Sequence, residues 1–187
     1  MNIQNNIQDI LASNPKIPVV TFHKLDQVAP ILNTLIAKNI QCIEITLRTP
    51  IAAEAIKHCQ TIAPEGFSIG VGTILEKQQV QLCQDLGVDF MVSPGSTPAL
   101  IQQMQASGIP YLPGVMTPSE ILNAVASNCY YLKLFPFNIA GGAKALKTYA
   151  NVFPGVQFCP TGGVNADNFQ ALLDLKNVLS VGGSWLV

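Results

Sequence analysis

Short apolar runs that alternate with amphipathic stretches limit the folds open to this chain more than any other feature. Eight runs are rich in β-branched or apolar residues, as buried strands are. These predicted strands lie at residues 18–22, 41–47, 68–71, 88–92, 110–113, 130–135, 156–160 and 178–182. The stretches between them have the spacing of amphipathic helices, at residues 25–38, 51–63, 76–86, 97–107, 117–127, 141–151 and 166–175. The alternation predicts an α/β protein.

The number of predicted strands decides between two α/β architectures. Eight strands alternating with helices fit a closed (β/α)8 TIM barrel better than an open doubly wound sheet, which usually has about five or six strands. An extra helix is expected at residues 1–14, ahead of a barrel at 18–187, and no linker divides the chain into separate domains. The eighth outer helix is missing after 178–182, so either the chain is truncated or another subunit closes the barrel.

Two predicted helices carry clear start signals. Thr97 and Thr117 each stand before a proline, as N-cap residues often do. Glu120 follows Thr117 by three residues, which predicts a capping box. Gly87 and Gly108 follow helical stretches and predict C-terminal caps. These signals fix the helix boundaries more closely than periodicity alone.

Composition excludes several kinds of partner. The net charge is −1 and no basic cluster is present, so the footprint that binds nucleic acid is missing. No apolar run approaches the roughly eighteen residues of a membrane span, and the first residues lack the pattern of a secretory signal. We therefore expect a cytoplasmic protein with small-molecule partners. The hydrophobic fraction of 49% further suggests burial between subunits of an oligomer.

The cysteines and histidines do not form a recognisable metal or disulfide pattern. The five cysteines are widely spaced and include no C-x-x-C pair, so reduced core thiols are expected. The two histidines lack the ligand spacing of a zinc site. The residues concerned are Cys42, Cys59, Cys83, Cys129, Cys159, His23 and His58. No metal or cofactor is therefore predicted.

Parity along two strands brings a lysine and a glutamate together. Alternate residues of a barrel strand face the interior, and chemistry gathers at the carboxyl ends of the strands. In residues 41–48, Glu44 and Arg48 share the face opposite the apolar residues that suit packing under helices. In residues 130–135, Lys133 takes the inward side. Lys133 and Glu44 are therefore predicted to share one interior.

Two interpretations of this lysine remain open. A buried lysine can be structural, held charged by a carboxylate such as Glu44. Alternatively, an apolar cavity lowers the pKa of an amine, so that part of it is neutral near pH 7 and can attack a carbonyl to form a Schiff base. A neighbouring carboxylate could then move protons during carbon–carbon cleavage. Arg48 could grip a substrate carboxylate or simply neutralise Glu44.

Glycine pairs follow the last two predicted strands. They occur in the segments PTGGV (160–164) and VGGSW (181–185). Glycines there let backbone N–H groups approach an anion, and barrels of this class often bind phosphate at that place, although tight turns would explain the pairs too. The Ser184 hydroxyl beside the second pair favours phosphate binding. GVGT (70–73) and SPG (93–95) suit a close wall around a small ligand.

These motifs together resemble a known family, the class I 2-keto-3-deoxy-6-phosphogluconate (KDPG) aldolases, also called 4-hydroxy-2-oxoglutarate (KHG) aldolases. The similarity runs from about Pro18 to the last residue, and the motifs occur in the family's order and spacing. They are EITLRTP (44–50), GVGTIL (70–75), SPG (93–95), LPGVMTPSE (112–120), KLFP (133–136), CPTGGV (159–164) and GGSWLV (182–187).

The resemblance implies a role for each residue of the predicted site. In that family the lysine of K-x-F-P forms the Schiff base and the glutamate of E-x-T-L-R-T moves protons, which implies Lys133 and Glu44. The arginine of the same motif and the threonine of G-x-G-T hold the pyruvate carboxylate, which implies Arg48 and Thr73. The remaining roles are apolar walls of the pyruvate pocket at Pro94 and Phe135, contact with the aldehyde part at Thr161, and the phosphate end at Gly162, Gly163, Gly183 and Ser184.

The resemblance also implies the reaction and the assembly. Family members are typically homotrimers and use no metal. The expected activity is cleavage of KDPG to pyruvate and D-glyceraldehyde 3-phosphate, with 4-hydroxy-2-oxoglutarate as a further substrate. Three alternatives stay open: an aldolase for the 2-keto-3-deoxy-6-phosphogalactonate epimer, a non-catalytic barrel that binds a phosphorylated metabolite, and a metal-dependent aldolase. Retention of both Lys133 and Glu44 argues against the binder, and the lack of ligand spacing argues against the metal enzyme.

Overall fold

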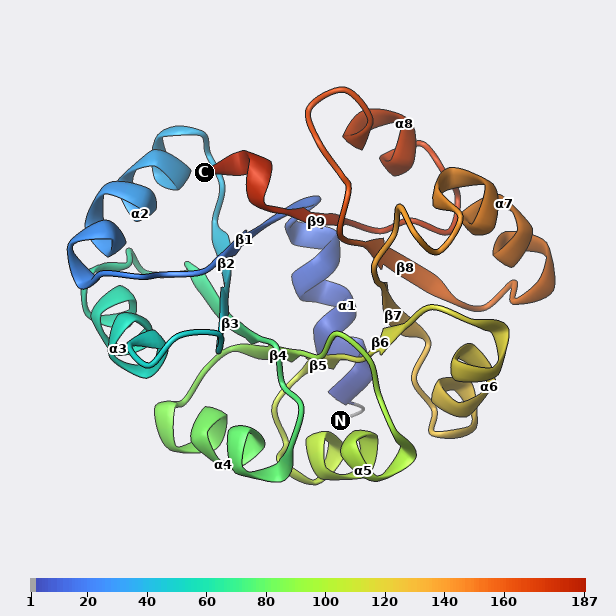
Figure 1. The fold of residues 1–187 in the computed structure, drawn as a ribbon, viewed down its shortest axis with the longest axis horizontal. Coiled ribbons are helices and arrows are strands. Elements are labelled where there is room, and N and C mark those ends of the chain that lie inside the picture. The colour runs from blue at the N-terminus through green and yellow to red at the C-terminus, as the bar shows by residue number, and fades with distance from the viewer. Residues whose placement is uncertain (1–2) are drawn as a thin grey trace.

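The structure is a computed structural model, which describes the backbone of residues 3–187 and the side chains of residues 6–187 (Figure 1). Met1 and Asn2, which belong to the predicted N-terminal helix, lie outside the described residues. The first part of the chain contains α1 (Ile3–Ser13), β1 (Lys16–Val20), a 3-10 helix (Leu25–Gln27), α2 (Val28–Ala37), β2 (Cys42–Thr46), α3 (Ala52–Ile62), β3 (Ser68–Gly72), α4 (Lys77–Leu86) and β4 (Phe90–Val92). The second part contains α5 (Pro98–Ala106), β5 (Tyr111–Leu112), β6 (Gly114–Val115), α6 (Pro118–Ala126), β7 (Tyr131–Leu134), α7 (Gly142–Val152), β8 (Gln157–Pro160), α8 (Phe169–Leu173), β9 (Val181–Gly183) and a 3-10 helix (Ser184–Leu186).

The strands form two parallel sheets, and the predicted closed eight-stranded TIM barrel is therefore wrong. One sheet has six strands in the order β5-β4-β3-β2-β1-β9, and the other has three in the order β6-β7-β8. All the pairings within both sheets are parallel. The fold remains α/β, because helices follow most of the strands and lie outside them (Figure 1).

Pro113 marks one of the two breaks between the sheets. The predicted strand at 110–113 contains β5, which pairs with β4, whereas β6 follows directly after it and pairs with β7. The Leu112 carbonyl accepts a hydrogen bond from Ser93 N, and the Pro113 carbonyl accepts one from Lys133 N at 2.9 Å. Because proline has no N–H, it cannot donate to a ladder, and the chain changes sheets at this residue.

The second break lies between β8 and β9. Only two isolated bridges connect this region within the described residues, Phe158 with Val178 and Thr161 with Gly182. Helix α1 packs against β5 of the larger sheet and β7 of the smaller one, behind the strands in Figure 1. Its buried side chains Ile7 and Leu11 thus help to hold the two sheets together.

The helix starts follow the sequence signals. The capping box of α6 is confirmed, because Glu120 accepts hydrogen bonds from Thr117 N at 2.7 Å and Met116 N at 2.8 Å. Thr97 Oγ1 accepts from Leu100 N at the start of α5. In residues 3–187, no helix combines the length and apolar character that crossing a membrane requires.

Strand register determines which side chains meet in the interior. On β2, Glu44 lies opposite Val19 of β1 and Gly70 of β3. On β7, Lys133 lies opposite Cys159 of β8. Glu44 therefore belongs to the six-stranded sheet and Lys133 to the three-stranded sheet. Any contact between their side chains joins the two sheets across the interior.

Candidate active site

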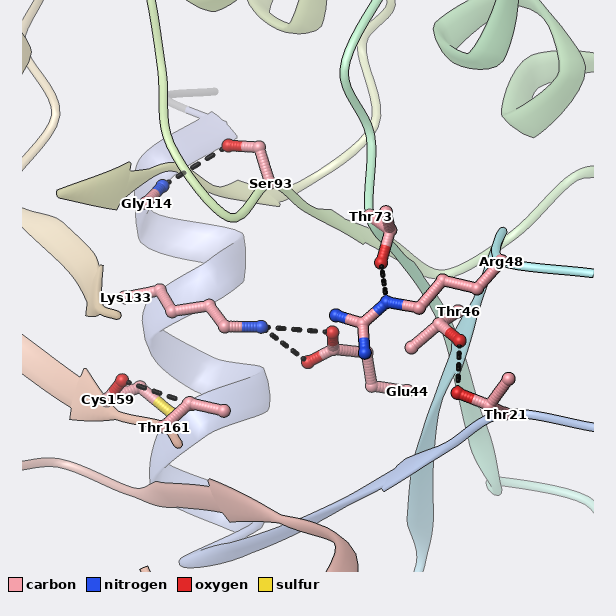
Figure 2. A network of polar contacts seen from close by, with 10 residues as sticks. All are labelled: Thr21, Glu44, Thr46, Arg48, Thr73, Ser93, Gly114, Lys133, Cys159 and Thr161. Carbon is pink, nitrogen blue, oxygen red and sulfur yellow. Dashed lines mark hydrogen bonds and ion pairs between the residues drawn. The ribbon is translucent and has the colours of Figure 1, made fainter. Parts of the chain in front are cut away.

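A buried ion pair occupies the space between the two sheets. Lys133 Nζ lies 3.1 Å from Glu44 Oε1 and 3.4 Å from Glu44 Oε2, and both residues are 3% exposed (Figure 2). The neighbours Leu132 and Leu134 are completely buried on the opposite face of β7, where they pack under the helices. Strand alternation alone therefore directs the lysine inward. The ring of Phe135 lies 5.3 Å from Lys133 Nζ and gives the cation a further contact.

Arg48 approaches the same place from the segment that follows β2. Its Nε donates a hydrogen bond of 2.9 Å to Thr73 Oγ1, and Figure 2 shows its guanidinium directed toward the Lys133–Glu44 pair. The Glu44 carboxylate forms its ion pair with Lys133. Arg48 is exposed, so its remaining N–H groups can reach a ligand in the site.

Thr73 holds an unusual backbone conformation. Its φ of 65° lies in the left-handed region, which a β-branched residue rarely adopts. Such strain is of the order of 1–3 kcal/mol and persists only where the surrounding structure imposes it. In this position the Thr73 hydroxyl meets Arg48 Nε, so the strained residue helps to orient the arginine.

One cavity of about 460 Å³ opens above the ion pair and brings most of the predicted site together. Two further predicted residues are linked to it, because Glu44 contacts Lys133 and Thr73 contacts Arg48. The predicted site residues that line the cavity are Arg48, Lys133, Phe135, Thr161, Gly162, Gly163, Gly183 and Ser184. The lysine and the glycine-rich segments therefore face one shared space.

The glycine-rich end of the cavity exposes backbone. Gly162 and Gly163 have φ values of 88° and 91°, and a Cβ at Gly163 would lie 2.6 Å from the Cβ of Asn138. Only glycine fits such a conformation and such a close approach. Together with Gly183 and the exposed Ser184 hydroxyl, these residues offer backbone N–H and O–H donors to an anion.

Pro94 does not line this cavity. It follows Ser93, whose buried hydroxyl accepts a hydrogen bond from Gly114 N at 3.2 Å (Figure 2) and also bonds with the Ser96 hydroxyl. The Pro94 backbone lies directly against Gly114, so closely that no side chain fits at that position. Pro94 therefore lies where β4 and β6 meet, at one break between the sheets.

Thr21 lines the cavity but is absent from the residues identified in the sequence. Its hydroxyl lies 2.7 Å from the Thr46 hydroxyl, which is completely buried (Figure 2). Parity gives Thr21 the same orientation as Val19, but only the register, in which Val19 lies opposite Glu44, shows that this is the inward face. A hydroxyl there adds a polar group to an otherwise aliphatic wall formed by β1.

Two thiols lie close to the ion pair. Burial raises the pKa of the Cys42 thiol to about 12 and that of the Cys159 thiol to about 11, and the Glu44 carboxylate adds to both shifts. Both cysteines are free, and both are neutral near pH 7. They therefore surround the pair with weakly polar groups and do not compete with the amine as nucleophiles. No group of three His, Cys, Asp or Glu side chains among the described residues could hold a metal ion.

The arrangement defines a class of enzyme. A buried amine in contact with a carboxylate, open to a cavity with an anion-binding end, can capture a keto group and move protons around it. These are the features of a class I aldolase, a carbon–carbon lyase that works through a lysine Schiff base. The remaining question is which aldolases the chain resembles.

Comparison with known proteins answers this question. The family model described as KDPG and KHG aldolase matches residues 7–187. The KHG/KDPG aldolase of Escherichia coli K12 is 38% identical over 186 residues, which cover 100% of this chain and 87% of that protein. The chain belongs to the KDPG and KHG aldolase family, as its motifs predicted.

Two solved structures agree with this assignment. One is a KDPG aldolase from Legionella pneumophila, with pyruvate captured at low pH as a covalent carbinolamine intermediate. It is 39% identical in sequence, its TM-score is 0.92, and the match covers 96% of this chain and 87% of that one. The KDPG aldolase of Zymomonas mobilis ZM4 with 3-phosphoglycerate is 35% identical with a TM-score of 0.94, over 98% of this chain and 87% of that one.

Proposed function

We propose that this protein cleaves KDPG to pyruvate and D-glyceraldehyde 3-phosphate through an imine on Lys133, and that it also cleaves 4-hydroxy-2-oxoglutarate to pyruvate and glyoxylate. The observation that carries the proposal is the buried contact of 3.1 Å between Lys133 Nζ and Glu44 Oε1. Binding of a phosphorylated metabolite would not require such a pair. Burying two charges has a desolvation cost, and a protein that only binds phosphate has no chemical use for them.

Imine formation begins at Lys133. The ammonium transfers a proton to Glu44, and the neutral amine attacks the C2 keto carbon of the substrate to form a C–N bond. Glu44 then returns its proton to the hydroxyl of the carbinolamine, which leaves as water, so that a protonated imine and the Glu44 carboxylate remain. The short distance between the amine and the carboxylate supports direct transfer of the protons involved.

Cleavage uses the same pair. Glu44, as the carboxylate, removes the proton of the C4 hydroxyl, the C3–C4 bond breaks, and its electron pair moves into the protonated imine to give an enamine. The aldehyde leaves, and Glu44 returns the proton to C3. Hydrolysis of the new imine then releases pyruvate and regenerates Lys133.

The other site residues have binding roles in this proposal. Arg48 and Thr73 hold the pyruvate carboxylate, Phe135 provides an apolar wall, and Thr161 contacts the aldehyde part. The location of Arg48 beside the ion pair supports the first of these roles. The phosphate lies at the opposite end of the cavity, where the donors are Gly162, Gly163, Gly183 and Ser184.

The assembly and the setting belong to the same proposal. The 187 residues act as one domain, and the protein works as a homotrimer in the cytoplasm. The five buried free thiols support a reducing compartment. Among the side chains that the structure describes, eight large hydrophobic ones are exposed, including Leu75 and Ile139, and they support burial of surface between subunits.

The proposal is tested by measuring the release of pyruvate from KDPG, with lactate dehydrogenase and the oxidation of NADH as the readout. The wild type is expected to cleave KDPG in the presence of a chelator and to cleave the galactonate epimer more slowly. Glu44→Gln should lose about a hundredfold to ten-thousandfold in kcat, and Lys133→Arg should fall to background. The exposed Lys147→Arg is the matched control and should match the wild type. A folded wild type that binds KDPG without releasing pyruvate would show that it is only a binding protein.

A further inference from the structure

Gly72 is in direct contact with the proposed proton-transfer group, although it has no side chain of its own. It is the last residue of β3, is buried, and lies opposite Thr46 in the register with β2. A Cβ built at this position would overlap Glu44 Oε1 and would lie 2.8 Å from both Cδ and Cγ of Glu44. The three nearest atoms all belong to this one glutamate. The Glu44 carboxylate therefore occupies the space that a side chain at residue 72 would fill.

The backbone at Gly72 leaves little room for adjustment. The register of β2 with β3 continues over five residue pairs, and Leu47 N donates a hydrogen bond of 2.9 Å to the Gly72 carbonyl. Gly72 is not among the glycines with positive φ, so alanine could adopt the same backbone conformation. Replacing Gly72 with alanine thus changes volume without adding backbone strain, and the Glu44 side chain has to move.

Gly70, two residues earlier, shows that the contact at Gly72 is specific. Gly70 lies on the same face of β3 and opposite Glu44 in the register, yet a Cβ there would meet only atoms of the Phe90 ring among its three nearest contacts. The absent side chain at Gly70 therefore makes room for a core aromatic ring, whereas the absent side chain at Gly72 makes room for a reactive carboxylate. Two glycines of one motif have different tasks.

We infer that Gly72 is a positioning residue: its missing side chain lets the Glu44 carboxylate lie against the β3 backbone at hydrogen-bonding distance from Lys133. This inference rests on the proposed function of Glu44 in proton transfer. The carboxylate is confined by the Gly72 backbone and by the two contacts to Lys133 Nζ at 3.1 and 3.4 Å. An added methyl group would push it out of this position, and a displacement of about 1 Å can slow a reaction by as much as a hundredfold.

Proton transfer and imine formation should therefore respond differently to Gly72→Ala. With pyruvate in D2O, Glu44 removes a proton from C3 of the pyruvate imine to give the enamine, which then takes up deuterium from the solvent. We expect methyl exchange, measured by NMR, to slow between about tenfold and a hundredfold. Borohydride reduction over a long incubation with pyruvate should still trap Lys133 to completion, because reduction is irreversible and collects the imine even if a displaced Glu44 forms it more slowly. A loss of packing alone would reduce both signals together.

Gly155→Ala is the matched control, because a Cβ there would meet nothing within 4 Å and the φ of Gly155 is not positive. It should exchange and trap as the wild type does. Exchange by Gly72→Ala within twofold of the wild type would overturn the inference. A wild type that neither exchanges nor traps would instead refute the proposed function, while leaving the contact between residues 72 and 44 to be tested by stability.

That stability test also covers a Gly72→Ala variant that folds poorly. In the Glu44→Ala background the carboxylate is absent, so the alanine at residue 72 has space. Gly72→Ala should lower the melting temperature of the wild type. The same change should lower it much less in the Glu44→Ala background, and a double-mutant cycle measures the difference. An equal loss in both backgrounds would mean that some other group meets the new methyl, and would overturn the inference.

Discussion

Removing Lys133 alone should destabilise the protein strongly, because it leaves the Glu44 carboxylate buried without its cation. Glu44 is 3% exposed, and Lys133 makes both of its contacts of 3.1 and 3.4 Å. Loss of one member of such a pair typically lowers the free energy of unfolding by about 3–5 kcal/mol. For a chain of 187 residues, this corresponds to a fall in melting temperature of roughly 6–20 °C. Lys133→Met is the suitable change, since methionine has nearly the same shape without the charge.

The double variant Lys133→Met/Glu44→Gln separates the buried charge from the lost packing. It removes both charges at almost unchanged volume, and apolar or neutral replacements of buried ion pairs are often neutral or stabilising. We therefore expect the double variant to regain at least half of the stability lost by Lys133→Met. The outcome would mean that the pair is present for its chemistry and not for stability.

Urea unfolding at pH 7, followed by circular dichroism, measures both effects. The control is Lys147→Met on the exposed surface of α7, which should change the free energy of unfolding by less than about 0.5 kcal/mol. The reasoning is refuted if Lys133→Met loses less than about 1 kcal/mol, or if the double variant is no more stable than the single one. Either result would place the Glu44 carboxylate in contact with water or with another cation.

Two further predictions concern Thr73 and Glu120. The free energy of unfolding of Thr73→Gly should be about 1 kcal/mol higher than that of Thr73→Ala, because glycine relieves the φ of 65°. Both variants should raise the KM for KDPG, because Arg48 loses its hydrogen-bond acceptor. Equal stability of the two variants would contradict the first expectation. Burial opposes ionisation of Glu120, but hydrogen bonds from Met116 N, Thr117 N and the Thr117 hydroxyl outweigh it and lower the pKa of Glu120. The stability that its charge provides is thus complete above its ordinary pKa and is lost as the pH falls through the lowered value. Glu120→Gln should accordingly lower the melting temperature at pH 7 more than at pH 3, and an equal effect at both pH values would contradict this.

The sequence locates the strands well but does not reveal how they pair. All eight predicted strands overlap one observed strand each, because β-branched and apolar runs are local features, and only β6 (Gly114–Val115) lies outside the predicted ranges. Closure of a barrel depends instead on hydrogen bonds between distant segments. Pro113, inside the predicted strand at 110–113, was the available warning, since a proline cannot donate to a ladder. The break between β8 and β9 has no comparable local sign.

The candidate site shows a similar division. Parity places Lys133 and Glu44 in one interior because both lie within regular strands, where orientation follows directly from position. Gly72 could be read from the sequence only as a point of close backbone approach, since the atom that fills its space comes from a different strand. Thr21 needed the pairing of β1 with β2 as well as its own position. Residues whose role depends on another segment are those that the sequence does not identify.

The most direct test of the account is to locate the imine. The folded wild-type protein is incubated with pyruvate, reduced with borohydride, digested, and mapped by mass spectrometry. We expect the reduced pyruvate adduct on the peptide that contains Lys133, and no adduct in Lys133→Arg. A folded wild-type protein without an adduct, or with the adduct on another lysine, would contradict the claim that the amine buried beside Glu44 captures the keto group.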